Sequence, residues 1–385
     1  WLTEILENTE PNPPELEFDT DEDLHTLLFT GGTTGRPKGC MITHKNLVAN
    51  ALQNTKAQSQ ISNMIRGNAT ILNALPFYHA YGYTVMHTFI NLAARQLVVP
   101  DPRDKDEMLE LVKEYKPLVM MGVPTQFMEI VDGVDGVSMV GVSGSAPLAS
   151  ETKEEYDERS GGGITQGYGL SEMSPVTHFN VRGLLEGIRG EPSDDYDFDM
   201  PTIGVPVPDT EVKLADIDTG EEIDIWDAIE NEKEGELLVK GPQRMLGYLD
   251  EERDPFDDEG FISTGDVVKV DSKGRFYVVD RVKDMINVSG LKVYSEEVDD
   301  ILHDLEGVKR GATVGVPDPE RPGSELVKVY IEQEEGANLT EDEVVKFLEE
   351  HVAKHAVPEY VEFLDEIPLT PIGKVDKKEL RDENE

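Results

Sequence analysis

The chain has 385 residues, 38% of them hydrophobic, which is enough for two or three domains with real cores and argues against a disordered protein. Its 79 Asp and Glu outnumber 35 Lys and Arg, giving a formal net charge of -44 that disfavours nucleic acid and anionic membranes as partners. One cysteine, Cys40, excludes an internal disulfide framework and fits a cytoplasmic protein, and no apolar run approaches the roughly 18 residues of a membrane span.

The acidic residues are spread along the whole chain rather than gathered in a tail. A solvated carboxylate surface of this kind fits high intracellular salt, where screening relieves the repulsion between like charges. We therefore expect a halophilic protein. This pattern informs on habitat and not on the reaction.

The first predicted elements are a strand at residues 24–29, a glycine-rich loop, and a helix at 42–52 with Thr43 as its cap. The loop reads Thr30-Gly31-Gly32-Thr33-Thr34-Gly35-Arg36-Pro37-Lys38-Gly39. Glycines let backbone N–H groups approach an anion, hydroxyls donate further hydrogen bonds, and the two cations add charge. It is not a Walker A loop, because no Gly-Lys-Ser/Thr ends it. The loop predicts a polyphosphate site, and the alternative is a flexible surface loop.

The following segments alternate between strand-like and helical patterns. Strands are predicted at residues 71–75, 96–99, 118–122 and 139–143, and helices at 107–115 and 150–159. This alternation predicts an α/β unit in which helices cover a sheet.

Short strands between glycine and proline turns fill residues 203–280 and predict a β-rich subdomain. A smaller α+β unit follows, with helices at 295–305 and 341–355 and strands at 313–316 and 327–332. We therefore expect one domain at residues 1–280 and a second at 281–385.

Short motifs in these units carry residues suited to a nucleotide. In Gly167-Tyr168-Gly169-Leu170-Ser171-Glu172, the tyrosine offers a flat face for a purine and the glutamate an oxygen ligand for Mg²⁺. In Ser263-Thr264-Gly265-Asp266, predicted to close a strand, the acid can accept hydrogen bonds from a ribose diol. The alternatives are a buried tyrosine with a surface glutamate, and an ordinary Asx turn.

Two further motifs lie in the smaller unit. Residues 281–290 are charged and polar at the expected boundary, where they form either a hinge or an ordinary linker. Pro371-Ile372-Gly373-Lys374 presents a lysine that either reaches into a cleft to stabilise phosphate charge or stays solvated.

In this order and spacing, the motifs resemble those of adenylate-forming enzymes, the superfamily of acyl-CoA synthetases, adenylation domains of peptide synthetases and firefly-type luciferases. The resemblance covers essentially the whole chain. It implies an acyl-CoA synthetase-like fold, with a large N-terminal α/β domain that includes the β subdomain and a small mobile α+β C-terminal domain. Family members have on the order of a hundred residues or more before the phosphate loop. Here 29 residues precede it, so we expect the N-terminal domain to be incomplete.

The resemblance also implies residue roles. Glu172 would bind Mg²⁺ and Lys374 would catalyse adenylation, with Thr30 as a further catalytic residue. His79, in Phe77-Tyr78-His79, would gate or bind the substrate carboxylate, although it also fits an ordinary packed histidine. The implied nucleotide-binding and CoA-binding residues are Thr30, Gly31, Gly32, Thr33, Thr34, Gly35, Lys38, Gly144, Ser145, Ala146, Gly167, Tyr168, Gly169, Ser171, Asp266, Arg281, Lys283, Ser289 and Gly290.

The implied reaction activates a carboxylic acid with ATP and Mg²⁺ to acyl-AMP and then transfers the acyl group to CoA. The C-terminal domain would rotate about Lys283 between the two steps and bring Ser289 and Gly290 toward the thiol channel. Residues 122–125, 144–146 and 173–176 are small or apolar, which favours fatty or aryl acids over amino acids. The segment from Gly169 to Val176 resembles medium- and long-chain fatty acyl-CoA ligases.

Two alternatives remain open, and a homodimer is compatible with each. One is an adenylation module that delivers its product to a carrier protein. The other is a truncated paralogue that binds nucleotide without turnover.

Overall fold

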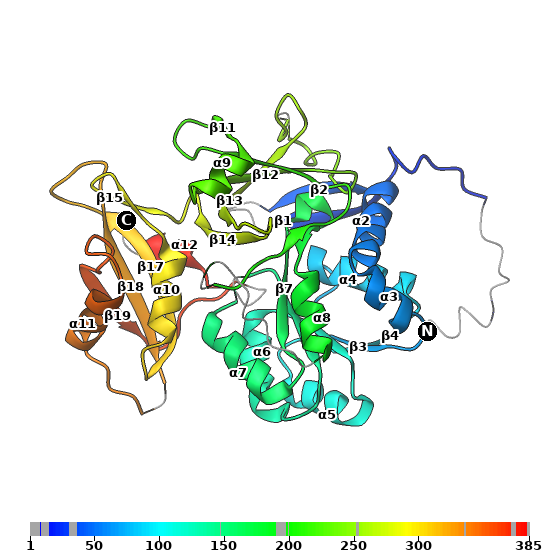
Figure 1. Cartoon of the computed structure of the whole chain (residues 1–385), viewed down its shortest axis with the longest axis horizontal. Coiled ribbons are helices and arrows are strands. Elements are labelled where there is room, and N and C mark those ends of the chain that lie inside the picture. Colours follow the sequence, from blue (N-terminus) through cyan, green and yellow to red (C-terminus); the bar gives the residue numbers. More distant parts are fainter. Residues whose placement is uncertain are drawn as a thin grey trace.

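The computed structural model of the chain describes residues 8, 15–30, 37–146, 148–189, 198, 200–251, 254–334, 336–370 and 375–382. A seven-stranded sheet is its largest element (Figure 1). In spatial order its strands are β4 (Arg95–Val98), β3 (Thr70–Asn73), β5 (Val119–Gly122), β6 (Val140–Ser143), β7 (Ile164–Gly169), β8 (Val176–Phe179) and β9 (Val205–Pro206). The run from β4 to β7 is parallel, and β8 and β9 join antiparallel.

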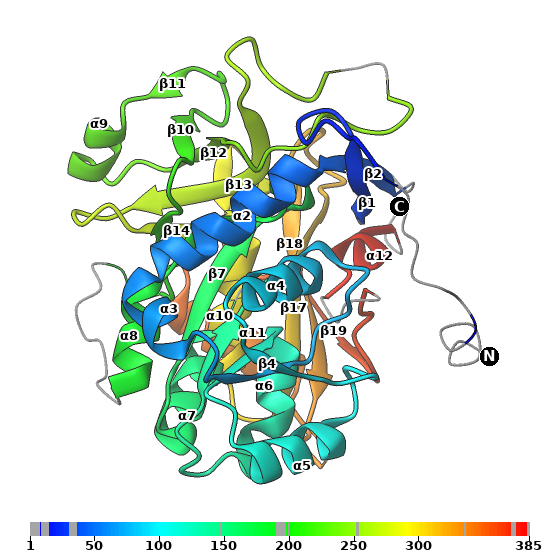
Figure 2. The ribbon, with the colours of Figure 1, turned by 90° about the vertical axis from the view of Figure 1, so that its right-hand side faces the viewer.

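Helices cover both faces of this sheet (Figures 1 and 2). Successive strand residues point to opposite faces, so Met120 packs into one core cluster and Met121 into the other. The face of Met121 is covered by α3 (Ser59–Ile65), α4 (Ala80–Asn91) and α8 (Val181–Arg189). The face of Met120 is covered by α5 (Lys105–Tyr115), α6 (Pro124–Ile130), η1 (Val131–Gly133) and α7 (Ser150–Ser160). The predicted α/β arrangement is confirmed.

A second, antiparallel sheet packs beside the first and forms the predicted β-rich region. Its strands, in spatial order, are β11 (Glu222–Ile223), β10 (Glu211–Ala215), β12 (Gly235–Lys240), β13 (Ile262–Val270) and β14 (Phe276–Arg281), and α9 (Ile225–Glu230) contacts β13. The motif from Ser263 to Asp266 was predicted to close a strand, and this prediction is wrong. The motif lies inside β13, because β12 pairs with residues on both sides of Gly265 and β14 pairs from Asp266 onward. Gly265, with a φ of 74°, lies at the register shift in the β12–β13 pairing.

The glycine-rich loop joins two strands instead of a strand and a helix. β1 (Leu24–Thr30) and β2 (Lys38–Thr43) pair antiparallel, and helix α2 (His44–Ala57) begins only after Thr43. The prediction that Ile42 opens the helix is wrong, because Cys40 and Ile42 are fully buried on a strand paired with β1. Thr43 does cap α2, accepting a hydrogen bond from the backbone N–H of Asn46 at 3.2 Å.

The remaining elements form the small C-terminal domain, at the left of Figure 1. They are β15 (Ile286–Val288), β16 (Leu291–Val293), α10 (Ser295–His303), β17 (Val308–Pro317), β18 (Glu325–Gln333), α11 (Glu341–His351), β19 (Tyr360–Leu364) and α12 (Lys377–Asp382). β17 and β18 pair antiparallel, and β19 joins β18 in parallel. The expected boundary after residue 280 falls one residue before the end of β14 and remains a prediction.

Candidate active site

A cavity of about 1740 Å³ lies between the two domains. Its N-terminal side is formed by the carboxyl ends of β5, β6 and β7 and by residues of β13 and β14, and α10 and α12 close the C-terminal side. Ligands of open α/β sheets bind at the carboxyl ends of the strands, so this cavity is the candidate active site.

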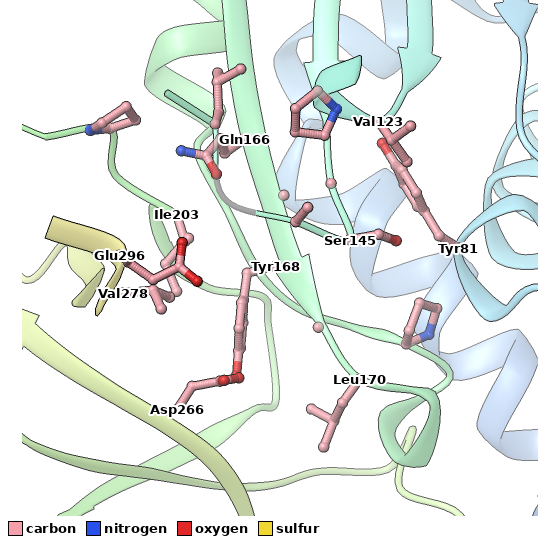
Figure 3. Close-up of a pocket in the computed structure, with 18 of the residues that line it drawn as sticks. Tyr81, Val123, Ser145, Gln166, Tyr168, Leu170, Ile203, Asp266, Val278 and Glu296 are labelled. Atoms are coloured by element: carbon pink, nitrogen blue, oxygen red, sulfur yellow. The ribbon is translucent and has the colours of Figure 1, made fainter. Parts of the chain in front are cut away.

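Tyr168, Asp266 and Arg281 form a connected group on the N-terminal side. Tyr168 stands near the end of β7, and its hydroxyl donates to Asp266 Oδ2 at 2.5 Å (Figure 3). Arg281 Nε donates to Asp266 Oδ1 at 2.9 Å, because the two residues are cross-strand partners on β13 and β14. Burial, and then the Asp266 charge, raise the pKa of Tyr168, so the phenol stays protonated. The carboxylate is thus oriented at the cavity by two donors.

Glu172 and the base of the glycine-rich loop form a second group. Glu172 lies in η2 (Ser171–Met173), the short 3₁₀ turn after β7, and its Oε1 accepts a hydrogen bond from the Tyr248 hydroxyl at 2.6 Å. Thr30 and Lys38 face each other across the β1–β2 pair, and both line the cavity with Glu172. The structure therefore brings the base of the loop and the candidate metal ligand to one site.

Glu172 fits a Mg²⁺ ion that arrives with phosphates. Mg²⁺ is usually held by one or two carboxylates together with substrate phosphates and waters. In the described ranges, no group of three or more His, Cys, Asp or Glu residues is arranged to hold a metal by itself. Glu172 is a half-buried carboxylate on the cavity lining, which matches this mode of binding.

Close packing explains why glycine stands at positions 144 and 169. A Cβ on Gly169 would lie 2.0 Å from the backbone oxygen of Pro175, and one on Gly144 would lie 3.0 Å from the Tyr81 ring. Ser145 adopts a φ of 73°, which turns the chain after β6. The predicted residues Gly144, Ser145, Ala146, Gly167, Gly169 and Ser171 all line the cavity.

His79 caps helix α4 and lines the cavity. Its Nδ1 accepts a hydrogen bond from the backbone N–H of Tyr81 at 3.3 Å. Tyr81 is buried and donates its hydroxyl to the carbonyl of Val142 at 3.0 Å. The capping contact gives His79 a structural role, and its role toward the substrate carboxylate remains a prediction.

The C-terminal side of the cavity is acidic. We call Glu296, Asp299, Asp300 and Lys377 the C-terminal wall, and Tyr168, Glu172, Tyr248, Asp266 and Arg281 the N-terminal wall. In the C-terminal wall, Lys377 Nζ lies 2.7 Å from Asp299 Oδ2 and 3.4 Å from Glu296 Oε1. Burial raises the pKa of Asp299 and brings that of Asp300 to about 7, whereas the carboxylates raise the pKa of Lys377 despite its burial.

Asp280 connects the two domains next to this wall. It is fully buried at the end of β14, and it accepts hydrogen bonds from the backbone N–H of Ser295 and, at 3.2 Å, from the Ser295 hydroxyl. Lys377 Nζ donates to the same hydroxyl at 2.8 Å. Burial raises the pKa of Asp280 to about 7.

The remaining predicted residues are distributed as follows. Lys283 lines the cavity, and burial lowers its pKa. Ser289 and Gly290 are outside the cavity lining, at the turn between β15 and β16, where Arg321 donates to the Ser289 hydroxyl at 2.8 Å. Gly31, Gly32, Thr33, Thr34, Gly35 and Lys374 lie outside the described residues.

The lining residues that the sequence analysis missed include Gln166, Tyr248 and Lys377. Gln166 precedes Tyr168 by two positions on β7, so strand alternation places both on one face, a signal that was available (Figure 3). Tyr248 and Lys377 had no local signal, because their partners Glu172 and Asp299 lie 76 and 78 positions away.

The chain matches family models and known proteins over most of its length. A family model described as AMP-binding enzyme matches residues 2–249, and one described as AMP-binding enzyme C-terminal domain matches residues 297–374. The chain is 35% identical over 371 residues to the long-chain-fatty-acid–CoA ligase of Salmonella typhimurium, covering 94% of this chain and 62% of that protein. It is 32% identical over 384 residues to a feruloyl-CoA synthase of an Amycolatopsis species, covering 98% of this chain and 73% of that protein.

A solved structure also matches the chain over nearly its whole length. ATP-bound MatB from Rhodopseudomonas palustris matches with a TM-score of 0.84 and 28% identity, over 99% of this chain and 72% of that one. Among the described residues, no helix has the length and apolarity needed to cross a bilayer. Since the first family model alone covers more than half of the sequence, the chain belongs to the AMP-binding enzyme family, and the resemblance to adenylate-forming enzymes is confirmed.

Proposed function

We propose that the protein activates a carboxylic acid with ATP, giving acyl-AMP and pyrophosphate, and then transfers the acyl group to CoA, giving acyl-CoA and AMP. The observation that carries this proposal is the N-terminal wall, where Tyr168, Asp266 and Glu172 line one cavity with the base of the glycine-rich loop. The names of the ligase and the synthase that the chain resembles support CoA as the acceptor.

The N-terminal wall suits the nucleoside end of ATP. The Tyr168 ring offers a stacking face for adenine, and Gln166 beside it offers an amide that can both donate to and accept from a base edge. Asp266 would accept hydrogen bonds from the ribose hydroxyls in exchange for the one from Tyr168, while Arg281 keeps the carboxylate oriented.

The phosphate end would lie at Thr30, Lys38 and Glu172. Mg²⁺ bound there with the phosphates would neutralise part of their charge. The substrate carboxylate would attack the α-phosphorus, forming a new P–O bond while the bond to pyrophosphate breaks. Lys38, the loop hydroxyls and Lys374, whose role rests on the resemblance, would stabilise the charge of this transition state.

An apolar arm of the cavity suits the acyl group. It opens onto the core between the sheet and helices α3 and α4, and its members are Ile61, Ile65, Val85, Phe89, Val119, Met121, Val142, Phe179 and Leu184. Its polar neighbours on the lining are the amides Asn54 and Gln58 and the hydroxyl of Thr88. An α-amino group would need a carboxylate partner in such surroundings, so the arm favours a fatty acid over an amino acid.

The second step needs the CoA thiol to attack the acyl carbon and release AMP. The predicted CoA-side residues Ser289 and Gly290 lie away from the cavity lining in the described arrangement. We therefore propose that the C-terminal domain turns about Lys283 between the steps, as a gating motion.

The test is carboxylate-dependent exchange of pyrophosphate into ATP, measured with fatty, aryl and amino acids. Molar KCl should be present, because the charge of -44 destabilises the fold through self-repulsion at low salt. We expect exchange with fatty acids, and acyl-CoA formation when CoA is added. Exchange that gives a thioester only with a pantetheinylated carrier protein would favour the adenylation-module alternative. Nucleotide binding without exchange for any acid would contradict the proposal.

A further inference from the structure

Tyr248 links the strand after the glycine-rich loop to the turn that carries Glu172. Its backbone forms a β-bridge with Cys40, and the N–H of the next residue, Leu249, donates to the carbonyl of Gly39 at 2.8 Å. Its hydroxyl reaches Glu172 Oε1 at 2.6 Å. Tyr248 therefore contacts two parts of the phosphate end of the site, one through its backbone and one through its hydroxyl.

We propose that Tyr248 is a positioning residue that orients the Glu172 carboxylate toward Mg²⁺ and the phosphates, an inference that rests on the proposed function. A glutamate side chain has three rotatable torsions, and a ligand that must be ordered on binding loses affinity through that entropy. The Tyr248 hydroxyl occupies one carboxylate oxygen and leaves the second for the ion. Hydrogen bonds from residues behind a metal ligand generally set its orientation and strength in this way.

The ring of Tyr248 also contacts the cation of the loop. Lys38 Nζ lies 4.9 Å from the ring centroid, within the range of a cation–π interaction. Lys38 Nζ also lies 3.9 Å from Oε1 of Glu251, and the side chains of Lys38 and Glu251 are each at least about a third exposed. A surface pair of this kind contributes little, so the ring has the larger part in holding Lys38.

The hydroxyl and the ring therefore act on different groups. The hydroxyl orients the acidic ligand, Glu172, and the ring holds the cation, Lys38, and all three residues line the cavity. Removing only the hydroxyl should weaken the Mg²⁺-dependent part of nucleotide binding. Removing the ring as well should also weaken the part that does not depend on Mg²⁺.

The test compares Tyr248→Phe with Tyr83→Phe. Tyr83 is also half-buried and pairs its hydroxyl with His25 Nδ1 at 3.2 Å, but it is not on the cavity lining. Calorimetry should measure the affinity of each protein for α,β-methylene-ATP, a non-reactive analogue, over a Mg²⁺ titration and in EDTA. We expect Tyr248→Phe to raise the half-saturating Mg²⁺ concentration about tenfold with little change in EDTA, and Tyr83→Phe to match the wild type.

Two further variants separate positioning from packing. In a Glu172→Gln background, adding Tyr248→Phe should cost little more, because both changes disable the same carboxylate. Tyr248→Leu should also weaken binding in EDTA, by about threefold, because the Lys38 contact is lost.

The outcomes distinguish this inference from the proposed function. Mg²⁺-dependent binding in the wild type, with Tyr248→Phe unchanged or additive to Glu172→Gln, would overturn the inference and leave the proposed function standing. A folded wild-type chain that binds no nucleotide would contradict both.

Discussion

The two walls of the cavity hold their charges in different ways. In the N-terminal wall, Asp266 and Glu172 are each held by one or two donors and remain within reach of the cavity. In the C-terminal wall, carboxylates gather around the buried ammonium of Lys377, and two of them have pKa values raised by burial. Half-buried carboxylates such as Glu172 and Asp266 can exchange a partner for a ligand, whereas the buried pair of Asp299 and Lys377 cannot separate without exposing a charge. The N-terminal wall is thus suited to binding, and the C-terminal wall to holding the domain together.

Lys377→Met should have the largest effect, and it should act on stability. The change leaves the buried Asp299 and the half-buried Glu296 without their cation, and breaking the buried pair costs about 3–5 kcal/mol of unfolding free energy. Lys378→Met is the matched control, because Lys378 is the next residue and is exposed. Denaturant unfolding in molar KCl measures both variants, and equal losses would remove the distinction between the walls.

Tyr168→Leu should affect binding more than folding. It removes the stacking face for adenine and should weaken nucleotide binding about tenfold, since base stacking on an aromatic ring contributes about 1–3 kcal/mol. Tyr168→Phe keeps the ring and loses only the hydrogen bond to Asp266, so its effect should be clearly smaller. Calorimetric titration with AMP measures both. If the two variants lose the same affinity, the hydroxyl and not the ring is the binding feature.

Asp280, which lies next to the C-terminal wall, should make the free energy of unfolding depend on pH. Its pKa rises from 3.8 to about 7 through burial, so the folded chain holds a proton that the unfolded chain has lost. The stability from this group is complete below about pH 4 and is lost as the pH rises through about 7. The melting temperature of the wild type should therefore fall more between about pH 5 and about pH 8 than that of Asp280→Asn. Parallel curves would show that Asp280 does not titrate in this range.

The salt concentration should have the smallest effect on the difference between the wild type and Lys377→Met. Screening acts on exposed carboxylates, so raising KCl from about 0.1 M to about 2 M should raise the melting temperatures of the wild type and Lys377→Met alike. The difference between the two melting temperatures should stay nearly constant, because Lys377 and Asp299 are buried. A difference that shrinks markedly with salt would mean that water and ions reach Lys377.

Local patterns predicted much of the fold. The buried parallel strands and their covering helices follow from apolar runs and helical periodicity, and Thr43 was recognised as a cap. The strand at 38–43 was missed, because its pairing with β1 is set by tertiary contacts and its apolar residues also fit a helix start. Asp266 was placed at a strand end because a glycine inside a strand looks like a turn.

Motif order predicted several residues that line the cavity, but not how they are held. Tyr168, Asp266 and Arg281 are hydrogen-bonded to one another on the lining, and their roles toward a nucleotide remain predictions. The supporting partners, Tyr248 and Lys377, act across long separations in sequence. Their hydrogen bonds depend on how the sheets and domains pack, which no local pattern encodes.

The most direct test of the central claim follows one oxygen atom. A fatty acid labelled with ¹⁸O in its carboxylate is incubated with the protein, ATP, Mg²⁺ and CoA in molar KCl, and the nucleotide and phosphate products are analysed by mass spectrometry. Attack on the α-phosphorus leaves a carboxylate oxygen on AMP when CoA takes the acyl group, so we predict a single ¹⁸O in AMP and none in pyrophosphate. Label in inorganic phosphate with ADP as the nucleotide product, or acyl-CoA formed with unlabelled AMP, would contradict the account.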